Sequence, residues 1–117
     1  MKNINNNVQL MGYLGKTPEI KTFEGGKKLA KVSIATSETY KNQKGERVKE
    51  TQWHNLIAWG KCAEIMERYL KKGSEVAIQG KLTSRNYDKD GIKRYITEIQ
   101  VNELKILNAK TENDVRE

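Results

Sequence analysis

The chain has 117 residues, of which 36% are apolar, and it carries a net charge of +7 with an isoelectric point near 9.5. This length suits a single domain with one modest core, and no stretch approaches the ~20 apolar residues of a membrane-spanning helix. A lone cysteine, Cys62, excludes an internal disulfide, and the first residues lack the apolar segment of a secretory signal, so we expect a cytoplasmic protein. The basic excess favours a negatively charged partner, either nucleic acid or anionic lipid.

Apolar and polar residues alternate near the N-terminus, which predicts a half-buried strand from Val8 to Leu14. Gly12 and Gly15 indicate a bulge or a bend there, as in a tightly curved sheet. Pro18 then interrupts regular pairing before a short run from Ile20 to Phe23.

A turn signal at residues 24–27 precedes a second alternating strand, from Ala30 to Thr36. The polar stretch from Tyr40 to Glu50 contains Lys44-Gly45-Glu46, which predicts the tip of a hairpin. A third strand follows from Thr51 to Lys61 and holds both tryptophans of the chain.

This third strand has two different faces. Because side chains alternate along a strand, Trp53 and Trp59 share one face, roughly 20 Å apart at about 3.3 Å per residue. Leu56 and Ala58 lie on the other face, which we expect to be the core. Two flat rings on the outer face of a basic protein indicate stacking surfaces for nucleic acid bases, with ordinary core packing as the alternative.

Residues 61–72 change to a helical period. Apolar side chains recur at i, i+3, i+4, i+7 and i+8, which predicts an amphipathic helix from Lys61 to Lys72. Gly73 suits its C-terminal cap, and Cys62 on the apolar face is interpreted as a small core residue.

Two further strands follow, from Val76 to Leu82 and from Tyr95 to Val101, and residues 104–107 extend the last one. Between them, Asp88-Lys89-Asp90-Gly91 is a predicted hairpin turn in which Gly91 takes positive φ.

Residues 1–107 therefore form one predicted domain, and residues 108–117 a short polar C-terminal tail that we expect to be disordered. The domain has the order strand, strand, strand, helix, strand, strand. A helix between the third and fourth strands of a small all-β domain predicts an OB-fold, a five-stranded Greek-key barrel that often binds nucleic acid. A fold does not by itself establish a function, which must come from the site.

Short motifs follow one another along the chain in a specific order and spacing. They are Asn7-Val8-Gln9-Leu10-Met11-Gly12-Tyr13-Leu14-Gly15, Thr17-Pro18-Glu19, Ala35-Thr36-Ser37-Glu38, Thr51-Gln52-Trp53-His54, Trp59-Gly60-Lys61, Tyr69-Leu70-Lys71-Lys72-Gly73-Ser74 and Gly80-Lys81-Leu82. With these motifs the chain resembles the bacterial single-stranded-DNA-binding proteins over residues 1 to about 107.

That family stacks bases on aromatic residues, so the resemblance implies four stacking platforms, at Tyr40, Trp53, Trp59 and Tyr87. It also implies sequence-independent binding and protection of single-stranded DNA in replication, recombination and repair. The implied assembly is a nucleoid-associated homotetramer with DNA wrapped around its outside.

Basic side chains would neutralise the phosphates, although any single lysine is more often a solvated charge. Arg85 lies two residues from Tyr87, and Lys61 lies two residues from Trp59, so each is expected on the face of its aromatic neighbour. The predicted phosphate contacts are Lys21, Lys41, Lys61, Lys72, Arg85 and Arg94.

The sequence predicts no catalytic, metal or cofactor site. His54, the only histidine, lies on the face opposite the tryptophans, and a lone histidine cannot build a metal site or a triad. It is interpreted as a packing residue with satisfied hydrogen bonds that, by the resemblance, lies near a subunit interface. Tyr13, Tyr69 and Tyr95 are interpreted as structural residues.

Two other functions stay open, an RNA-binding or replication-restart OB-fold protein and a small OB-fold nuclease. No residue reveals a contact to a 2′-hydroxyl, and the acidic residues are too scattered to suggest a metal cluster. Members of the family usually end in an acidic, aromatic-tipped tail that recruits replication and repair proteins. This chain ends in Asn113-Asp114-Val115-Arg116-Glu117, so recruitment through such a tip is not expected.

Overall fold

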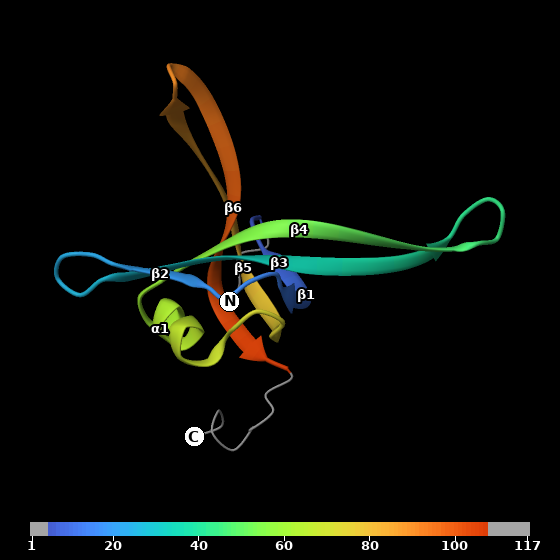
Figure 1. Cartoon of the computed structure of the whole chain (residues 1–117), viewed down its shortest axis with the longest axis horizontal. Helices are drawn as coiled ribbons and strands as arrows, with labels where there is room; N and C mark the ends of the chain where they lie inside the picture. The colour runs from blue at the N-terminus through green and yellow to red at the C-terminus, as the bar shows by residue number, and fades with distance from the viewer. Residues whose placement is uncertain (1–4, 108–117) are drawn as a thin grey trace.

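The computed structural model describes residues 5–107, and the predicted tail at residues 108–117 lies outside them. Figure 1 shows a small barrel with one helix beside it and two long hairpins that project in different directions. The elements in chain order are β1 (Val8–Leu14), β2 (Glu19–Thr22), β3 (Lys28–Lys41), β4 (Arg47–Trp59), α1 (Gly60–Tyr69), β5 (Glu75–Lys89) and β6 (Ile92–Ile106).

The strands form one sheet in the order β1-β5-β6-β4-β3-β2, and an additional pairing between β1 and β3 closes it. Five strands, β1 and β3 to β6, therefore make the barrel, and β2 adds a short sixth strand beside β3. β4 and β6 pair in parallel through Leu56–Ile99 and Ile57–Gln100, whereas the other pairs are antiparallel. With α1 between the third and fourth barrel strands, this is the all-β OB-fold that the sequence predicts.

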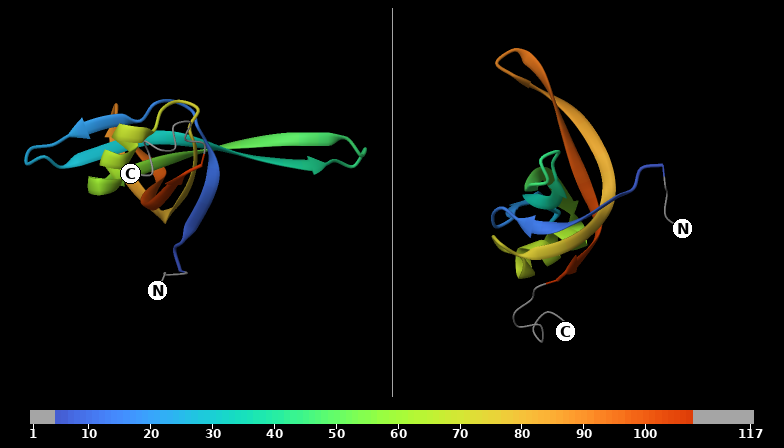
Figure 2. Two further views of the ribbon diagram at one scale, coloured as in Figure 1. Left: turned by 90° about the horizontal axis from the view of Figure 1, so that it is seen from below. Right: turned by 90° about the vertical axis from the view of Figure 1, so that its right-hand side faces the viewer.

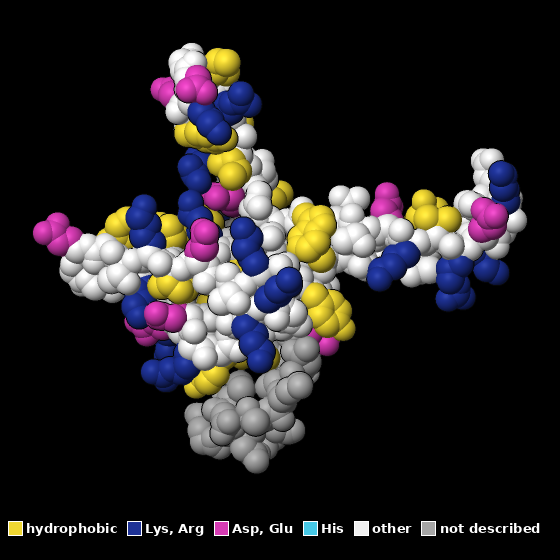
Figure 3. Space-filling model, in the orientation of Figure 1, with side chains coloured by type: hydrophobic (Ala, Val, Ile, Leu, Met, Phe, Trp, Pro, Cys, Tyr) yellow, Lys and Arg dark blue, Asp and Glu magenta, His cyan; other side chains and the backbone are white. Residues whose placement is uncertain are grey.

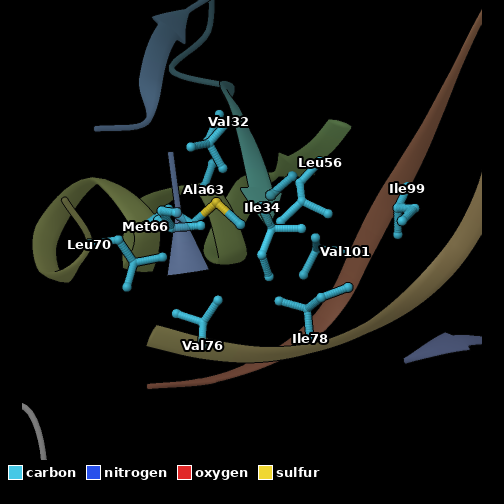
Figure 4. Close-up of a cluster of buried hydrophobic side chains, with 13 residues drawn as sticks. Val32, Ile34, Leu56, Ala63, Met66, Leu70, Val76, Ile78, Ile99 and Val101 are labelled. Atoms are coloured by element: carbon cyan, nitrogen blue, oxygen red, sulfur yellow. The ribbon is translucent and has the colours of Figure 1, made fainter. Parts of the chain in front are cut away.

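Apolar residues on the inner faces of the barrel strands build the core. Ile34, Leu56 and Val76 are almost fully buried, and α1 adds Ala63 and Met66 to the same cluster (Figure 4). These side chains alternate along the strands and stand three residues apart on the helix. The pattern that predicts the elements therefore also fills the barrel.

Glycine allows β1 to pass from one neighbour to another. β1 pairs with β5 as far as Tyr13 and with β3 at Tyr13 and Leu14. A Cβ on Gly12 would lie 2.0 Å from the carbonyl oxygen of Ala35, so only a residue without a side chain fits between the strands. β1 thus changes partner beside Gly12, where the sequence predicts a bulge or a bend, and a register shift occurs between β5 and β6, where Gln79 pairs with Glu103 but Gly80 pairs with Val101.

The predicted helix is correct in position but three residues too long. α1 ends at Tyr69, and Leu70 is already extended, with φ −103° and ψ 148°. Leu70 is buried, and its N–H still donates a hydrogen bond to the carbonyl of Met66, so the chain leaves the helix to place this side chain in the core. Gly73 does not cap the helix. It takes φ 89° in the turn that follows, where its N–H donates to the carbonyl of Leu14.

Outside the barrel, β3–β4 and β5–β6 continue as two-stranded ribbons that are longer than the sequence predicts (Figure 2). Solvent reaches both faces of such a ribbon, so apolar and polar residues need not alternate and the pattern cannot reveal its length. Both predicted hairpin turns are confirmed. Asn42 Oδ1 accepts hydrogen bonds from the N–H groups of Lys44 and Glu46 at 2.9 Å, and Asp90 and Gly91 both take positive φ.

Candidate nucleic-acid interface

The two faces of β4 differ as the sequence predicts. Leu56 and Ala58 are buried in the barrel, whereas Trp53 is 60% exposed and Trp59 is 37% exposed on the outer face. The register with β3 is continuous from Leu29–Trp59 to Lys41–Arg47, so the alternation of faces is not interrupted along this ribbon. Both indoles therefore lie outside the core.

The indole of Trp53 rests against the backbone of Gly15. A Cβ on Gly15 would lie 2.5 Å from Cζ3 and 2.9 Å from Cη2 of Trp53, which is closer than nonbonded carbon atoms pack. The cross-strand partner of Trp53 is Ala35, whose small side chain leaves much of the indole uncovered. Glycine at position 15 thus allows the ring to be supported by backbone while its remaining surface faces solvent.

Trp59 has an aromatic neighbour, Phe23, that the sequence pattern does not reveal. Its ring centroid lies 5.8 Å from that of Phe23, and the two planes are 27° apart. Lys27 Nζ lies 4.9 Å from the Trp59 ring centroid, and Lys21 Nζ lies 5.6 Å from that of Phe23. Finding this group requires the register of β2, β3 and β4 together, because Phe23 and Trp59 are far apart in the sequence.

A groove of about 220 Å³ joins the outer face of β4 to the β5–β6 hairpin. Asn55, which lines it, shares a strand face with Trp53, and Arg85, which lines the opposite side, shares one with Tyr87. The groove therefore lies between a position two residues from Trp53 on β4 and a position two residues from Tyr87 on β5. Its other polar lining residues are Lys16, Glu19, Lys31, Ser33 and Glu98.

Arg85 is held in this groove by a two-pronged ion pair. Its Nε lies 3.1 Å from Oε1 of Glu98 and its Nη2 lies 3.3 Å from Oε2, while Glu98 is only 4% exposed. The hydrogen bonds and the charge of Glu98 raise the pKa of Arg85. The side chain of Arg85 is half exposed, so the guanidinium is oriented towards Glu98 and also faces solvent.

The structure separates Tyr40 from the other predicted platforms. Tyr87 is exposed and lies opposite Arg94 on the Arg85 face of the β5–β6 hairpin. Tyr40 is also exposed, but its pair with Val48 stands an odd number of residues from the Trp53 pair. Tyr40 therefore lies on the opposite face of the β3–β4 ribbon.

Residues 5–107 match the model of the "Single-strand binding protein family". The chain belongs to this family. It is 44% identical over 109 residues to the "Single-stranded DNA-binding protein" of Neisseria meningitidis serogroup A, a match that covers 92% of this chain and 63% of that protein. It is 42% identical over 107 residues to the "Single-stranded DNA-binding protein 1" of Chlorobaculum tepidum, covering 90% and 66% respectively. The chain thus spans just under two thirds of the length of these curated relatives.

A solved structure described as "Plasmodium falciparum SSB complex with ssDNA" superposes with a TM-score of 0.80 and 31% sequence identity. The match covers 92% of this chain and 97% of that one. The two chains therefore share one fold over most of their length.

The basic residues predicted to contact phosphate are spread over several strands, the helix and one turn of the chain. Lys72 is exposed in the turn after α1, and its N–H donates to Oγ1 of Thr17 at 3.1 Å, which places it beside the β1–β2 loop. Lys41 pairs with Arg47 next to the β3–β4 tip. In Figure 3, Lys and Arg side chains lie across the barrel face in view and along the β3–β4 ribbon, with hydrophobic side chains between them.

The prediction that strand alternation places Lys61 on the face of Trp59 is wrong. β4 ends at Trp59 and α1 begins at Gly60, which takes φ 60°, so a strand period cannot relate Lys61 to Trp59. Lys61 is exposed in the first turn of the helix. Its position after Trp59 in the sequence does not define the direction of its side chain.

The remaining candidates divide into packed and exposed residues. His54 is half-buried with Nε2 3.1 Å from Oγ1 of Thr36, as expected for a packing residue with a hydrogen-bond partner. Cys62 is partly buried against the core, and burial, followed by the charge of Glu103, raises the pKa of its thiol. Tyr95 is 73% exposed, so burial within this chain does not give it the structural role expected.

Tyr13 is exposed in the same way, whereas Tyr69 is half-buried on α1. Within residues 5–107, no group of three or more His, Cys, Asp or Glu side chains is placed to hold a metal ion. No helix in that part of the chain is long and apolar enough to cross a bilayer.

Proposed function

We propose that this chain binds single-stranded DNA without reading its sequence, by stacking unpaired bases on aromatic side chains. The observation that supports this most strongly is the exposure of Trp53 and Trp59 on the outer face of β4, in a protein of net charge +7. A base–aromatic stack is worth ~1–3 kcal/mol and tolerates every base, because each base has a π-face. Two relatives named as single-stranded DNA-binding proteins and a neighbour described as an ssDNA complex support the same proposal.

The proposed DNA-binding domain comprises residues 1–107, and its platforms are Trp53, Trp59, Tyr87 and Tyr40. The groove lined by Asn55 and Arg85 lies between β4 and the β5–β6 hairpin, and it is the proposed path of the strand from the tryptophans to Tyr87. Tyr40 lies on the other face of the β3–β4 ribbon, so a strand must pass around that ribbon to reach it. Such a path suits DNA that wraps around the outside of the protein.

Phosphate neutralisation supplies the other part of the binding energy. Each contact to a single strand lowers the slope of log affinity against log salt by about 0.7, so six contacts would give a slope of about −4. Arg85 contributes less to phosphate binding than a free guanidinium because the carboxylate of Glu98 already neutralises part of its charge. The proposed phosphate contacts are Lys21, Lys41, Lys61, Lys72, Arg85 and Arg94.

We further propose that the chain acts as a homotetramer that protects single strands during replication, recombination and repair, in the cytoplasm at the nucleoid. An open groove of about 450 Å³ between β1, β5 and β6 is lined in part by Leu10, Met11, Ile78 and Leu104. Met11 is 62% exposed there. An exposed apolar groove of this kind suits contact with another copy of the chain.

The proposed activity is binding without catalysis. An RNA-binding protein of the same fold would use the same stacking and would differ in contacts to the 2′-hydroxyl. A nuclease would need a carboxylate cluster to hold a metal ion and would degrade the strand that it binds.

Titration with oligo(dT) of defined lengths, followed by light scattering, tests the proposal because it gives the assembly state and the site size together. We expect tight binding that weakens as salt rises, with oligo(dT) preferred over oligo(U) in competition. A clear preference for oligo(U) would reassign the protein to RNA. Metal-dependent degradation of oligo(dT) by the pure protein would reassign it to the nucleases.

A further inference from the structure

The β2–β3 hairpin holds an aromatic ring and an ammonium group side by side at its end. The N–H of Phe23 donates to the carbonyl of Lys27 at 2.7 Å, and the N–H of Gly26 donates to the carbonyl of Phe23 at 3.0 Å. Gly25 and Gly26 take φ 89° and 86°, and this conformation closes the turn between Phe23 and Lys27. Phe23 and Lys27 are therefore fixed as a cross-strand pair rather than being parts of a loose loop.

The register places this pair on the same face as the tryptophans. Lys21 lies opposite Leu29, and Leu29 lies opposite Trp59. Two-residue steps along β2 and β3 then bring Phe23 and Lys27 to that face. The ring and ammonium contacts between these residues agree with the register.

This face continues into the groove of about 220 Å³ that Asn55 and Arg85 line, which we call the central groove. A second groove, of about 380 Å³, is lined by Glu19, Ile20, Lys21, Leu29 and Lys31 along the hairpin. Glu19 and Lys31 also line the groove that leads to Arg85. A polymer that occupies the central groove can therefore continue towards the hairpin end without leaving the surface.

We propose that Phe23, together with Lys21 and Lys27, forms an additional nucleotide subsite that takes an unpaired base and its adjacent phosphates. This proposal rests on the single-strand binding function proposed above and extends its path along the β2–β3 hairpin. Phe23 is 38% exposed while it stacks on Trp59, so its ring can hold a base as the outer member of a two-ring platform.

The two lysines have different roles in the free and bound states. Without DNA their ammonium groups lie over the Trp59 and Phe23 rings. An exposed cation–π contact is weaker than a base–aromatic stack, so a base displaces the ammonium group from a ring. The displaced group then reaches the phosphate next to that base.

The test uses the full chain and oligo(dT) of increasing length. Phe23→Leu keeps an apolar side chain and removes the π-face, whereas Phe23→Tyr keeps the ring. We expect Phe23→Leu to weaken binding at least about fivefold for oligonucleotides long enough to reach the hairpin, with little effect on shorter ones. Phe23→Tyr should bind as the unchanged chain does, and the urea midpoint of each variant shows whether folding is retained.

Charge variants give a second readout that loss of packing would not change. Lys21→Gln and Lys27→Gln should each reduce the salt slope for long oligo(dT) by about 0.7, whereas Arg68→Gln, at an exposed position of α1 outside the proposed contacts, should leave it unchanged.

If Phe23→Leu binds long oligo(dT) normally, or if the two lysine variants keep the full salt slope, the subsite does not exist. Normal binding by Phe23→Leu together with weak binding by Trp53→Ala would overturn the subsite alone. Failure of the unchanged chain to bind oligo(dT) would instead overturn the proposed function.

Discussion

Replacing Gly15 by alanine tests whether the supported position of the Trp53 indole matters for binding. The added Cβ would lie 2.5 Å from Cζ3 of Trp53, whereas nonbonded carbon atoms pack about 3.5–4.0 Å apart. The indole must therefore move by about 1 Å or rotate away from the backbone of Gly15. Because the ring is 60% exposed, it can move into solvent without disturbing the core.

The expected loss of affinity follows from the free energy of one base–aromatic stack. If the displaced ring no longer stacks a base, affinity for oligo(dT) falls by up to ~1–3 kcal/mol, which is about five- to 150-fold. The free energy of unfolding in urea should change little, since no buried contact is lost. Binding is measured by a titration that does not depend on tryptophan emission, such as fluorescence anisotropy of labelled oligo(dT).

A double-mutant cycle provides the control. In a Trp53→Ala background, Gly15→Ala should have no further effect on affinity, because the ring that it displaces is already absent. Equal losses from Gly15→Ala in both backgrounds would refute the reasoning, as would unchanged affinity of the single variant.

Three further predictions follow from the same geometry. Trp53→Ala should lose about 1–3 kcal/mol of affinity for oligo(dT) while its urea midpoint stays near that of the unchanged chain, and unfolding with normal residual binding would instead place Trp53 in the core. Gly12→Ala should lower the urea midpoint strongly, because its Cβ would lie 2.0 Å from the carbonyl oxygen of Ala35, and a normal midpoint would contradict this close strand crossing. Because burial and Glu103 raise the pKa of Cys62, its thiol should react with iodoacetamide more slowly at pH 8 than after unfolding in urea, and equal rates would contradict that environment.

The barrel and the direction of the tryptophans can be predicted because both depend on local alternation. On β4, the buried pair Leu56 and Ala58 determines which face Trp53 and Trp59 must take. The same reasoning places Arg85 and Tyr87 together on β5, where the strand is regular. A two-residue period is sufficient wherever a strand continues through the residues concerned.

The predictions failed where the backbone changes its conformation or where partners come from distant strands. Lys61 could not be placed from Trp59 because Gly60 changes the chain from strand to helix. The end of α1 was set by the burial of Leu70, which no helix-capping pattern reveals. The Phe23–Trp59 stack depends on the pairing of three strands, and pairing is a tertiary property.

The exposed tyrosines show a different limit. Tyr13 and Tyr95 resemble ordinary strand residues in the sequence, yet each leaves most of its surface uncovered by this chain. A single sequence does not distinguish an aromatic residue that packs inside its own chain from one that faces solvent or another copy. The residues on one face of a strand can be predicted, but what covers that face cannot.

The most direct test of base stacking is the emission of Trp53 and Trp59 during titration with oligo(dT). Stacking brings bases against the indoles, so emission should be quenched and the quenching should saturate at the same ratio of DNA to protein as binding does. Unchanged emission at saturating oligo(dT) would show that neither indole meets a base, and the proposed interface would be wrong.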